Sequence, residues 1–195
     1  MSAVDLDAAV NALREGEVVA LPTESSFGLA VDALSPAAVE RLFVLKGRTR
    51  DKPPPLLIAD EAMLHRVVRV VPPRARALMQ RFWPGPLTLV LPPQPTLPSA
   101  LVLDDGIGVR ISPHAEAHKL CVRFGGPLTA SSANLSGQPA AMTAQQVQVY
   151  FPDLPIVGQL AGGGLPSTVV RVAEDGDFLI LREGAIARSQ IILDR

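Results

Sequence analysis

Residues 17–46, EVVALPTESSFGLAVDALSPAAVERLFVLK, carry two kinds of secondary-structure signal, one after the other. The run EVVALP is short and apolar and stops at Pro22, as a buried strand does. Ser35 and Pro36 then form an N-cap and first-turn pair, which predicts a helix that continues to Lys46. Because a strand followed by a helix is the repeating unit of α/β proteins, this stretch predicts an α/β fold.

The same alternation of short apolar runs and helical spacing continues along the chain. Further strands are predicted at 55–59, 87–91, 106–111, 127–131, 155–158, 167–172 and 178–182. Helices are predicted at 5–15, 60–71, 74–82, around 114–124 and near 143–150. The last two strands flank the short turn EDGD and predict a hairpin, so we expect a mixed sheet. Interleaved strands and helices indicate one sheet with helices on both faces.

Length and composition favour a single domain over residues 1–195. The chain is 48% hydrophobic and 19% charged, so it can bury a core. Its one cysteine, Cys121, excludes an intramolecular disulfide framework and a cysteine-based zinc cluster. A net charge of −1 argues against a general polyanion binder, although it leaves room for a local basic patch. Acidic residues near the start and the lack of a long apolar run predict a cytoplasmic protein without a membrane segment.

The densest cluster of charge is KGRTRDKP at 46–53, with four cations and one acid. It follows the end of a predicted helix, where one or two cations would stabilise the helix dipole. Four cations followed by prolines exceed that need, and lysine with arginine on a short loop suits a polyphosphate. We therefore interpret the segment as an anion-binding loop, with a solvated charged face as the alternative.

Two polar loops follow predicted strands and are candidates for a ligand site. TASSANLSG at 129–137 is rich in hydroxyl and amide groups, and LPTESSFG at 21–28 adds hydroxyls and Glu24. Ligands of α/β sheets bind outside the carboxyl ends of strands, where both loops would lie. Ordinary turn and N-cap chemistry explains either loop equally well. Arg110 and Arg182, each inside an apolar strand, would need an anionic partner from the protein or from a ligand.

Several other features carry weaker signals. Three histidines match no metal-ligand spacing, and no metal site is predicted from them: His65, His114 and His118. Gly162–Gly164 lacks the pattern of a phosphate-binding or dinucleotide turn, so we expect a flexible loop. A series of arginines between residues 66 and 81 is interpreted as a solvated helical face, with an RNA-facing surface as the alternative.

Seven segments, taken in order, resemble the YrdC/TsaC family, the threonylcarbamoyl-AMP synthases. They are PTESSFGL (22–29), KGRTRDKP (46–53), FWPGPLTLVL (82–91), GVRIS (108–112), SSANLSG (131–137), PSTVV (166–170) and LREG (181–184). One such segment would be weak evidence for the family, but seven segments in the right order are specific evidence. Because the chain ends soon after LREG, it resembles the short, single-domain form of the family.

The resemblance implies a twisted α/β sheet whose concave, positively charged side holds the active site. It implies a nucleotidyl transfer in which L-threonine, bicarbonate or CO2, and ATP give L-threonylcarbamoyl-AMP and pyrophosphate, with Mg²⁺ accompanying ATP. It also implies a separate transferase that uses the product to modify tRNA. The family is further associated with RNA binding, which would be weak here because aromatic residues make up 4% of the chain.

The site residues of the family carry over onto this sequence by position. The catalytic Lys-x-Arg and Ser-x-Asn signature falls on Lys46, Arg48, Ser132 and Asn134. The residues implied to contact ATP are Lys46, Arg48, Lys52, Ser132 and Arg182. The residues implied to hold threonine are Thr23, Ser25, Arg110, Ala130 (through its backbone) and Ser167. Among these, Arg110 is the natural partner of the threonine carboxylate.

The sequence also departs from the family pattern. Ser25 replaces a second threonine but keeps a hydroxyl, whereas Phe27 replaces a tyrosine and loses one. Leu57 stands where some members place a histidine that touches threonine, and Thr49 stands where a proline commonly follows the arginine. Two alternatives to the synthase remain: an RNA-binding module of the same fold, or a paralogue that acts on another substrate.

Overall fold

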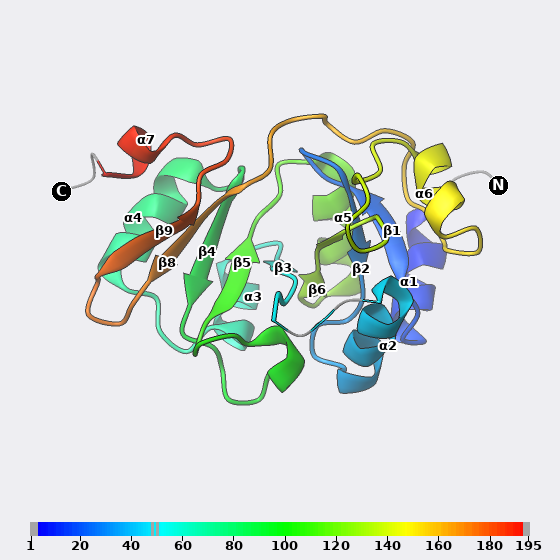
Figure 1. Cartoon of the computed structure of the whole chain (residues 1–195). Coiled ribbons are helices and arrows are strands. Elements are labelled where there is room, and N and C mark those ends of the chain that lie inside the picture. Colours follow the sequence, from blue (N-terminus) through cyan, green and yellow to red (C-terminus); the bar gives the residue numbers. More distant parts are fainter. Residues whose placement is uncertain (1–3, 48, 50, 193–195) are drawn as a thin grey trace.

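The computed structural model describes residues 4–47, 49 and 51–192. The strands form a three-stranded and a six-stranded sheet, which lie beside each other in Figure 1. The strands are β1 (Val19–Pro22), β2 (Phe27–Ala30), β3 (Leu56–Leu57), β4 (Leu87–Leu91), β5 (Ile107–Arg110), β6 (Leu128–Thr129), β7 (Ser131–Ser132), β8 (Thr168–Val172) and β9 (Phe178–Arg182). The helices are α1 (Leu6–Arg14), α2 (Pro36–Lys46), α3 (Glu61–Val67), α4 (Pro73–Phe82), α5 (Ala115–Phe124), α6 (Ala144–Tyr150) and α7 (Arg188–Ile192), with a 3-10 turn η1 (Ser99–Leu101).

The six-stranded sheet has the order β6-β3-β5-β4-β8-β9 and is mixed, as the sequence predicts. The pairs β3–β5 and β4–β8 are parallel, and the other neighbours in this sheet are antiparallel. The hairpin expected near the end of the chain is β8–β9, where Val172 pairs with Phe178. The smaller sheet has the order β1-β2-β7 and is antiparallel.

Local sequence signals explain where α1 and α2 begin and where α2 ends. Ser35 caps α2, because its side chain accepts a hydrogen bond from a backbone N–H of the first turn, and Pro36 occupies that turn. Gly47 ends the helix in the left-handed conformation with φ 56°, which glycine adopts without strain. Asp5 caps α1 in the same way as Ser35 caps α2. The end of α2 therefore fixes where the basic segment of the sequence leaves the helix.

Burial follows position in the two sheets. β1, β2 and β3 are buried at every residue, whereas the edge strand β9 is exposed or half-buried along its length. α1 and α5 pack together and against β1. In Figure 1, α4 lies behind the β8–β9 hairpin and α3 lies behind β5. Large core side chains come from both sheets and from the helices, among them Phe27, Leu42, Leu64, Leu78 and Leu89.

The structure differs from the sequence-based expectations in four respects. The segment 155–158 is not a strand, because Ile156 makes only an isolated bridge with Ala20 of β1. The apolar run at 127–131 is divided between β6 in one sheet and β7 in the other. The strands consequently form two sheets rather than one. β2 and α7, of 4 and 5 residues, lie outside the predicted elements.

Candidate active site

A cavity of about 560 Å³ is lined by residues of both sheets. Its wall combines the loop between β1 and β2, the residues that follow β6, and the larger sheet around β5, β8 and β9. The sequence-predicted residues that line it are Thr23, Ser25, Arg110, Ala130, Ser132, Asn134, Ser167 and Arg182. Hydroxyl groups, an amide and two guanidinium groups from distant segments of the chain therefore meet at one cavity.

Lys46, the last residue of α2, joins the basic segment to the Ser-x-Asn loop. Its ammonium group donates to the carbonyl oxygen of Ser132 and, over 3.3 Å, to Oδ1 of Asn134. The Ser132 hydroxyl donates to the same Oδ1 over 2.6 Å, and the Asn134 amide donates to the carbonyl oxygen of Gln138 over 2.6 Å. Because Lys46 is only 4% exposed, a buried cation holds this loop at the cavity wall. Arg48, the other cation of the signature, lies outside the described residues.

The loop between β1 and β2 presents Thr23 and Ser25 to the cavity. Thr23 Oγ1 donates to the carbonyl oxygen of Ser26 over 2.7 Å and lies 3.3 Å from Ser25 Oγ. From outside, backbone amides of Gly162–Gly164 donate to the carbonyl oxygens of this loop. The glycine segment has no regular secondary structure, as expected of a loop, but hydrogen bonds tie it to the cavity wall.

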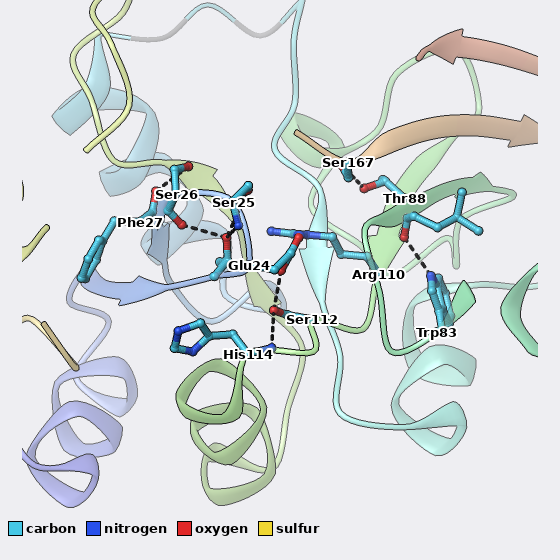
Figure 2. A network of polar contacts seen from close by, with 12 residues as sticks. Glu24, Ser25, Ser26, Phe27, Trp83, Thr88, Arg110, Ser112, His114 and Ser167 are labelled. Atoms are coloured by element: carbon cyan, nitrogen blue, oxygen red, sulfur yellow. Dashed lines mark hydrogen bonds and ion pairs between the residues drawn. The ribbon is translucent and has the colours of Figure 1, made fainter. Parts of the chain in front are cut away.

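Arg110 is the buried cation of the larger sheet, and Figure 2 shows its side chain directed at Glu24. Nη1 of Arg110 donates to Oε1 of Glu24, and the Ser112 hydroxyl donates to Oε2 over 2.7 Å. The side chains of Arg110 and Glu24 are 7% and 14% exposed. Burial, together with the charge of Arg182, lowers the pKa of Arg110 to about 10, so the guanidinium stays protonated at neutral pH.

The protein itself thus supplies an anionic partner for Arg110. Nε of Arg110 is nevertheless buried and has no hydrogen-bond partner among the described residues. Since Arg110 also lines the cavity, a carboxylate bound there would share the guanidinium with Glu24 rather than meet an isolated cation.

Arg182 does not match the expectation of a buried arginine with an acidic partner. It ends β9, an edge strand, and is exposed. Its Nη2 donates to the carbonyl oxygen and the hydroxyl of Ser167 over 2.8 and 3.2 Å. Ser167 Oγ in turn lies 2.9 Å from Thr88 Oγ1, a contact drawn in Figure 2. Partial burial lowers the pKa of Arg182 below its usual value. Within the described part of the chain, hydrogen bonds rather than a carboxylate orient this guanidinium.

A second cavity of about 280 Å³ adjoins the first and shares Pro55 and Arg182 with it. Lys52, which the resemblance assigns to ATP, lines this second cavity. Apolar side chains form much of its remaining wall: Val90, Leu103, Val169 and Leu181. A polar cavity therefore adjoins one that combines cations and the carboxylate of Asp51 with apolar surface, which suits a ligand with charged and apolar parts.

Sequence reasoning misses two polar residues of this network, Ser112 and Thr88. Ser112 follows the strand that carries Arg110, and only the fold shows that its hydroxyl reaches Glu24. Thr88 lies in the apolar strand LTLVL and is 2% exposed. A hydroxyl inside an apolar strand is the signal that points to Thr88, because a buried hydroxyl needs a hydrogen-bond partner.

The weaker sequence signals have structural explanations. The arginines between residues 66 and 81 contact other parts of the protein: Arg66 the carbonyl of Gly125, Arg69 Glu174, Arg74 the ring of Phe178, Arg76 Glu61, and Arg81 the carbonyl of Gln190. These contacts give the arginines partners within the protein and leave the side chains of Arg69 and Arg76 51% and 47% exposed. Among the residues that the structure describes, no group of three or more His, Cys, Asp or Glu side chains is placed to hold a metal. No described helix is long and apolar enough to cross a membrane.

An α/β domain that gathers cations and hydroxyl groups around one cavity has the groups that recognise a small anionic ligand. The chain belongs to the Sua5/YciO/YrdC family. The model of this family, described as telomere recombination, matches residues 11–184. The resemblance seen in the sequence motifs is thereby confirmed.

Similarity to known proteins extends over most of the chain. Threonylcarbamoyl-AMP synthases of Bacillus subtilis and Vibrio cholerae are 40% and 39% identical to it, each over 92% of its residues. The crystal structure of Pyrococcus abyssi Sua5 complexed with L-threonine matches 95% of the chain with a TM-score of 0.89 and 36% identity. The chain spans 53% of the B. subtilis protein, 56% of the P. abyssi chain and 97% of the V. cholerae protein.

Proposed function

We propose that this protein makes L-threonylcarbamoyl-AMP and pyrophosphate from L-threonine, bicarbonate or CO2, and ATP. One observation carries the proposal: a single cavity gathers hydroxyl groups, Arg110 and Arg182, with the ammonium of Lys46 at its wall. Relatives that bear the name of this synthase match most of the chain. The P. abyssi structure contains L-threonine, which supports an amino acid as one of the ligands.

L-Threonine fits the part of the cavity around Arg110. Its carboxylate would bind this guanidinium, which is charged at neutral pH and oriented by Glu24. The hydroxyls of Ser25 and Ser167 and the backbone of Ala130 line the same cavity and would meet the remaining polar groups. Thr23 would orient the Ser25 hydroxyl, which its own hydroxyl contacts. The amino-acid site therefore combines one fixed cation with several neutral donors.

ATP fits the part of the site where the other cations gather. Lys46, Lys52 and Arg182 would bind its phosphates together with Arg48. Because Lys46 is held by the Ser132 loop, its charge has a fixed position. The apolar wall of the second cavity would contact the nucleoside. In this proposal, the two adjoining cavities would hold both substrates.

The proposed reaction is a nucleotidyl transfer preceded by carboxylation. The threonine amine adds to the carbon of bicarbonate or CO2 to form a carbamate, and water leaves when bicarbonate is the donor. A carbamate oxygen then attacks the α-phosphorus of ATP, and the bond to the bridging oxygen breaks to release pyrophosphate. Such a displacement asks little covalent chemistry of the protein, so positioning and cationic charge would supply most of the rate.

Mg²⁺ would enter with ATP rather than bind at a site built by the protein. The wall of the first cavity offers hydroxyl groups and cations, and the carboxylate beside it, Glu24, is engaged by Arg110 and Ser112. Among the described residues, the wall of the second cavity adds one carboxylate, Asp51, which accepts a hydrogen bond from Thr49. In nucleotide sites Mg²⁺ usually keeps several waters and binds substrate phosphates together with one or two carboxylates, so the phosphates and water would supply most of its ligands here. When bound, the ion would neutralise part of the phosphate charge.

The proposed product is a mixed anhydride of a carbamic acid and AMP. Such an anhydride is an activated acyl donor, because AMP is a good leaving group. A separate transferase would consume it to modify tRNA. The role of this protein would therefore be to supply the activated group.

Pyrophosphate release tests the proposal directly. We expect release from ATP that requires L-threonine and falls when bicarbonate is omitted. A folded protein that binds ATP but releases no pyrophosphate with threonine would contradict the proposal and favour a paralogue with another substrate. A protein that binds no ATP would favour the RNA-binding module.

A further inference from the structure

We infer that Gly162–Gly164 is a positioning segment for the amino-acid side of the active site. The inference rests on the proposed function and concerns how the cavity loop Thr23–Ser25 is held. The segment belongs to the connection between α6 and β8, which crosses from one half of the molecule to the other in Figure 1. Its three glycines are exposed, so they do not act through packing of the core.

The three amides of the glycine segment donate to the three carbonyl groups of the cavity loop Thr23–Ser25. The donor and acceptor residues, with their N···O distances, are Gly162 to Thr23 (2.9 Å), Gly163 to Ser25 (3.2 Å) and Gly164 to Glu24 (3.0 Å). Each backbone carbonyl of the loop therefore has a partner in the segment. This backbone ladder fixes a loop that belongs to no strand.

The ladder depends on glycine, because other residues would collide with the loop or strain the backbone. A Cβ at Gly162 would lie 2.6 Å from the carbonyl oxygen of Glu24, closer than real Cβ contacts. A Cβ at Gly164 would lie 3.0 Å from the same oxygen. Gly163 has a φ of 73°, in the left-handed region that favours glycine. The two backbones can therefore approach this closely only without side chains on the segment.

The loop held by the ladder carries the groups that would select the amino acid. Thr23 and Ser25 line the cavity, and the side chain of Glu24 orients Arg110. A displacement of the Glu24 carbonyl would move all of them together. Lys46 and its contacts lie on α2 and the Ser132 loop, which make none of the three hydrogen bonds of the ladder. We therefore assign to the ladder a selective effect on threonine.

The variants Gly162→Ala and Gly164→Ala test this assignment, with Gly125→Ala as the control. Gly125 ends α5 in the left-handed conformation at φ 77° and does not line the cavity, so its substitution strains the backbone away from the site. Calorimetric titration measures the Kd of L-threonine and of ATP for each protein. Because each hydrogen bond to a charged carboxylate or ammonium is worth about tenfold or more in Kd, Gly162→Ala should weaken threonine binding about tenfold or more and change ATP binding less than about twofold. Gly164→Ala should have a smaller effect in the same direction, and Gly125→Ala should change neither Kd.

Amide hydrogen exchange provides a readout that does not depend on a ligand. The amides of Gly162–Gly164 should be protected in the unaltered protein and exchange faster in Gly162→Ala. Unprotected amides in the unaltered protein would overturn the inference, as would an unchanged threonine Kd in a folded Gly162→Ala variant. Unaltered protein that binds ATP but not threonine would overturn the proposed function and, with it, this inference. The results therefore separate failure of the ladder from failure of the function.

Discussion

Lys46 is the single residue whose removal should affect the proposed reaction most. Lys46→Ala takes away a buried ammonium that holds the Ser132 carbonyl and the Asn134 side chain beside the phosphate site. We expect the rate of pyrophosphate release to fall by about 100-fold or more, the magnitude typical of lost transition-state charge stabilisation. Lys119→Ala, at an exposed lysine on α5, is the matched control and should keep the rate. Near-normal turnover of folded Lys46→Ala would show that the phosphates bind elsewhere.

Arg110 and Glu24 form an ion pair, so the cost in stability of removing one side chain should depend on whether the other is present. Arg110→Ala should weaken threonine binding more than ATP binding, since the guanidinium is the proposed partner of the carboxylate. It also leaves Glu24, whose side chain is only 14% exposed, without its cation, which should lower the free energy of unfolding by about 3–5 kcal/mol. Adding Glu24→Gln removes that charge, so the double variant should be more stable than Arg110→Ala.

Calorimetry and urea unfolding distinguish these effects of Arg110. If Arg110→Ala lost ATP binding selectively, Arg110 would belong to the other ligand. Equal stability of the single and double variants would show that the buried pair is not coupled.

At the level of elements, α5 carries a buried thiol that reports on its packing. Burial raises the pKa of Cys121 to about 12, and the residue is 1% exposed. The thiol is therefore protonated and shielded near neutral pH, and iodoacetamide should alkylate it only after unfolding in denaturant. Mass spectrometry measures the extent of alkylation. Rapid alkylation of the folded protein would show that α5 does not pack against β1 as described.

The same pKa makes stability depend on pH. Between the ordinary thiol value of 9.0 and about 12, the folded state binds more protons than the unfolded state, so stability falls as pH rises. Above about pH 10 Arg110 acts in the opposite direction, because its pKa is lowered in the folded state. From pH 9 to 10 we therefore expect a fall of up to about 1.4 kcal/mol, which Cys121→Ala should reduce. Urea unfolding at both pH values measures it, and an identical slope in the variant would contradict this cause.

At the level of the whole molecule, the distribution of charge argues against strong binding of nucleic acid. The net charge is −1, and the arginines between residues 66 and 81 are engaged within the protein. We expect tRNA to bind weakly, with an affinity that falls steeply from about 50 to 200 mM salt, and to leave pyrophosphate release unchanged. Filter binding measures the affinity. Tight binding that resists salt would instead support the RNA-binding module.

Much of the fold could be predicted from short-range patterns in the sequence. Ser35 and Pro36 set the start of α2, the EDGD turn sets the β8–β9 hairpin, and apolar runs set β1 and β4. The residues of the two polar loops were recognisable as candidates because polar groups follow apolar strands there. Helix caps, turns and alternating apolar residues each depend on a few neighbouring residues, so they can be recognised in a short stretch of sequence.

Tertiary structure alone decided which of these groups meet. Lys46 reaches the Ser132 carbonyl and Arg110 reaches Glu24, each across a separation of 86 residues. Packing also divided the run at 127–131 between two sheets and laid the glycine segment against the cavity loop. Periodicity determines which face of an element is apolar, but not which distant element covers it. The sequence by itself therefore determined the elements and the chemical character of the site. The fold decided the pairings, because buried polar groups must find hydrogen-bond partners wherever packing places them.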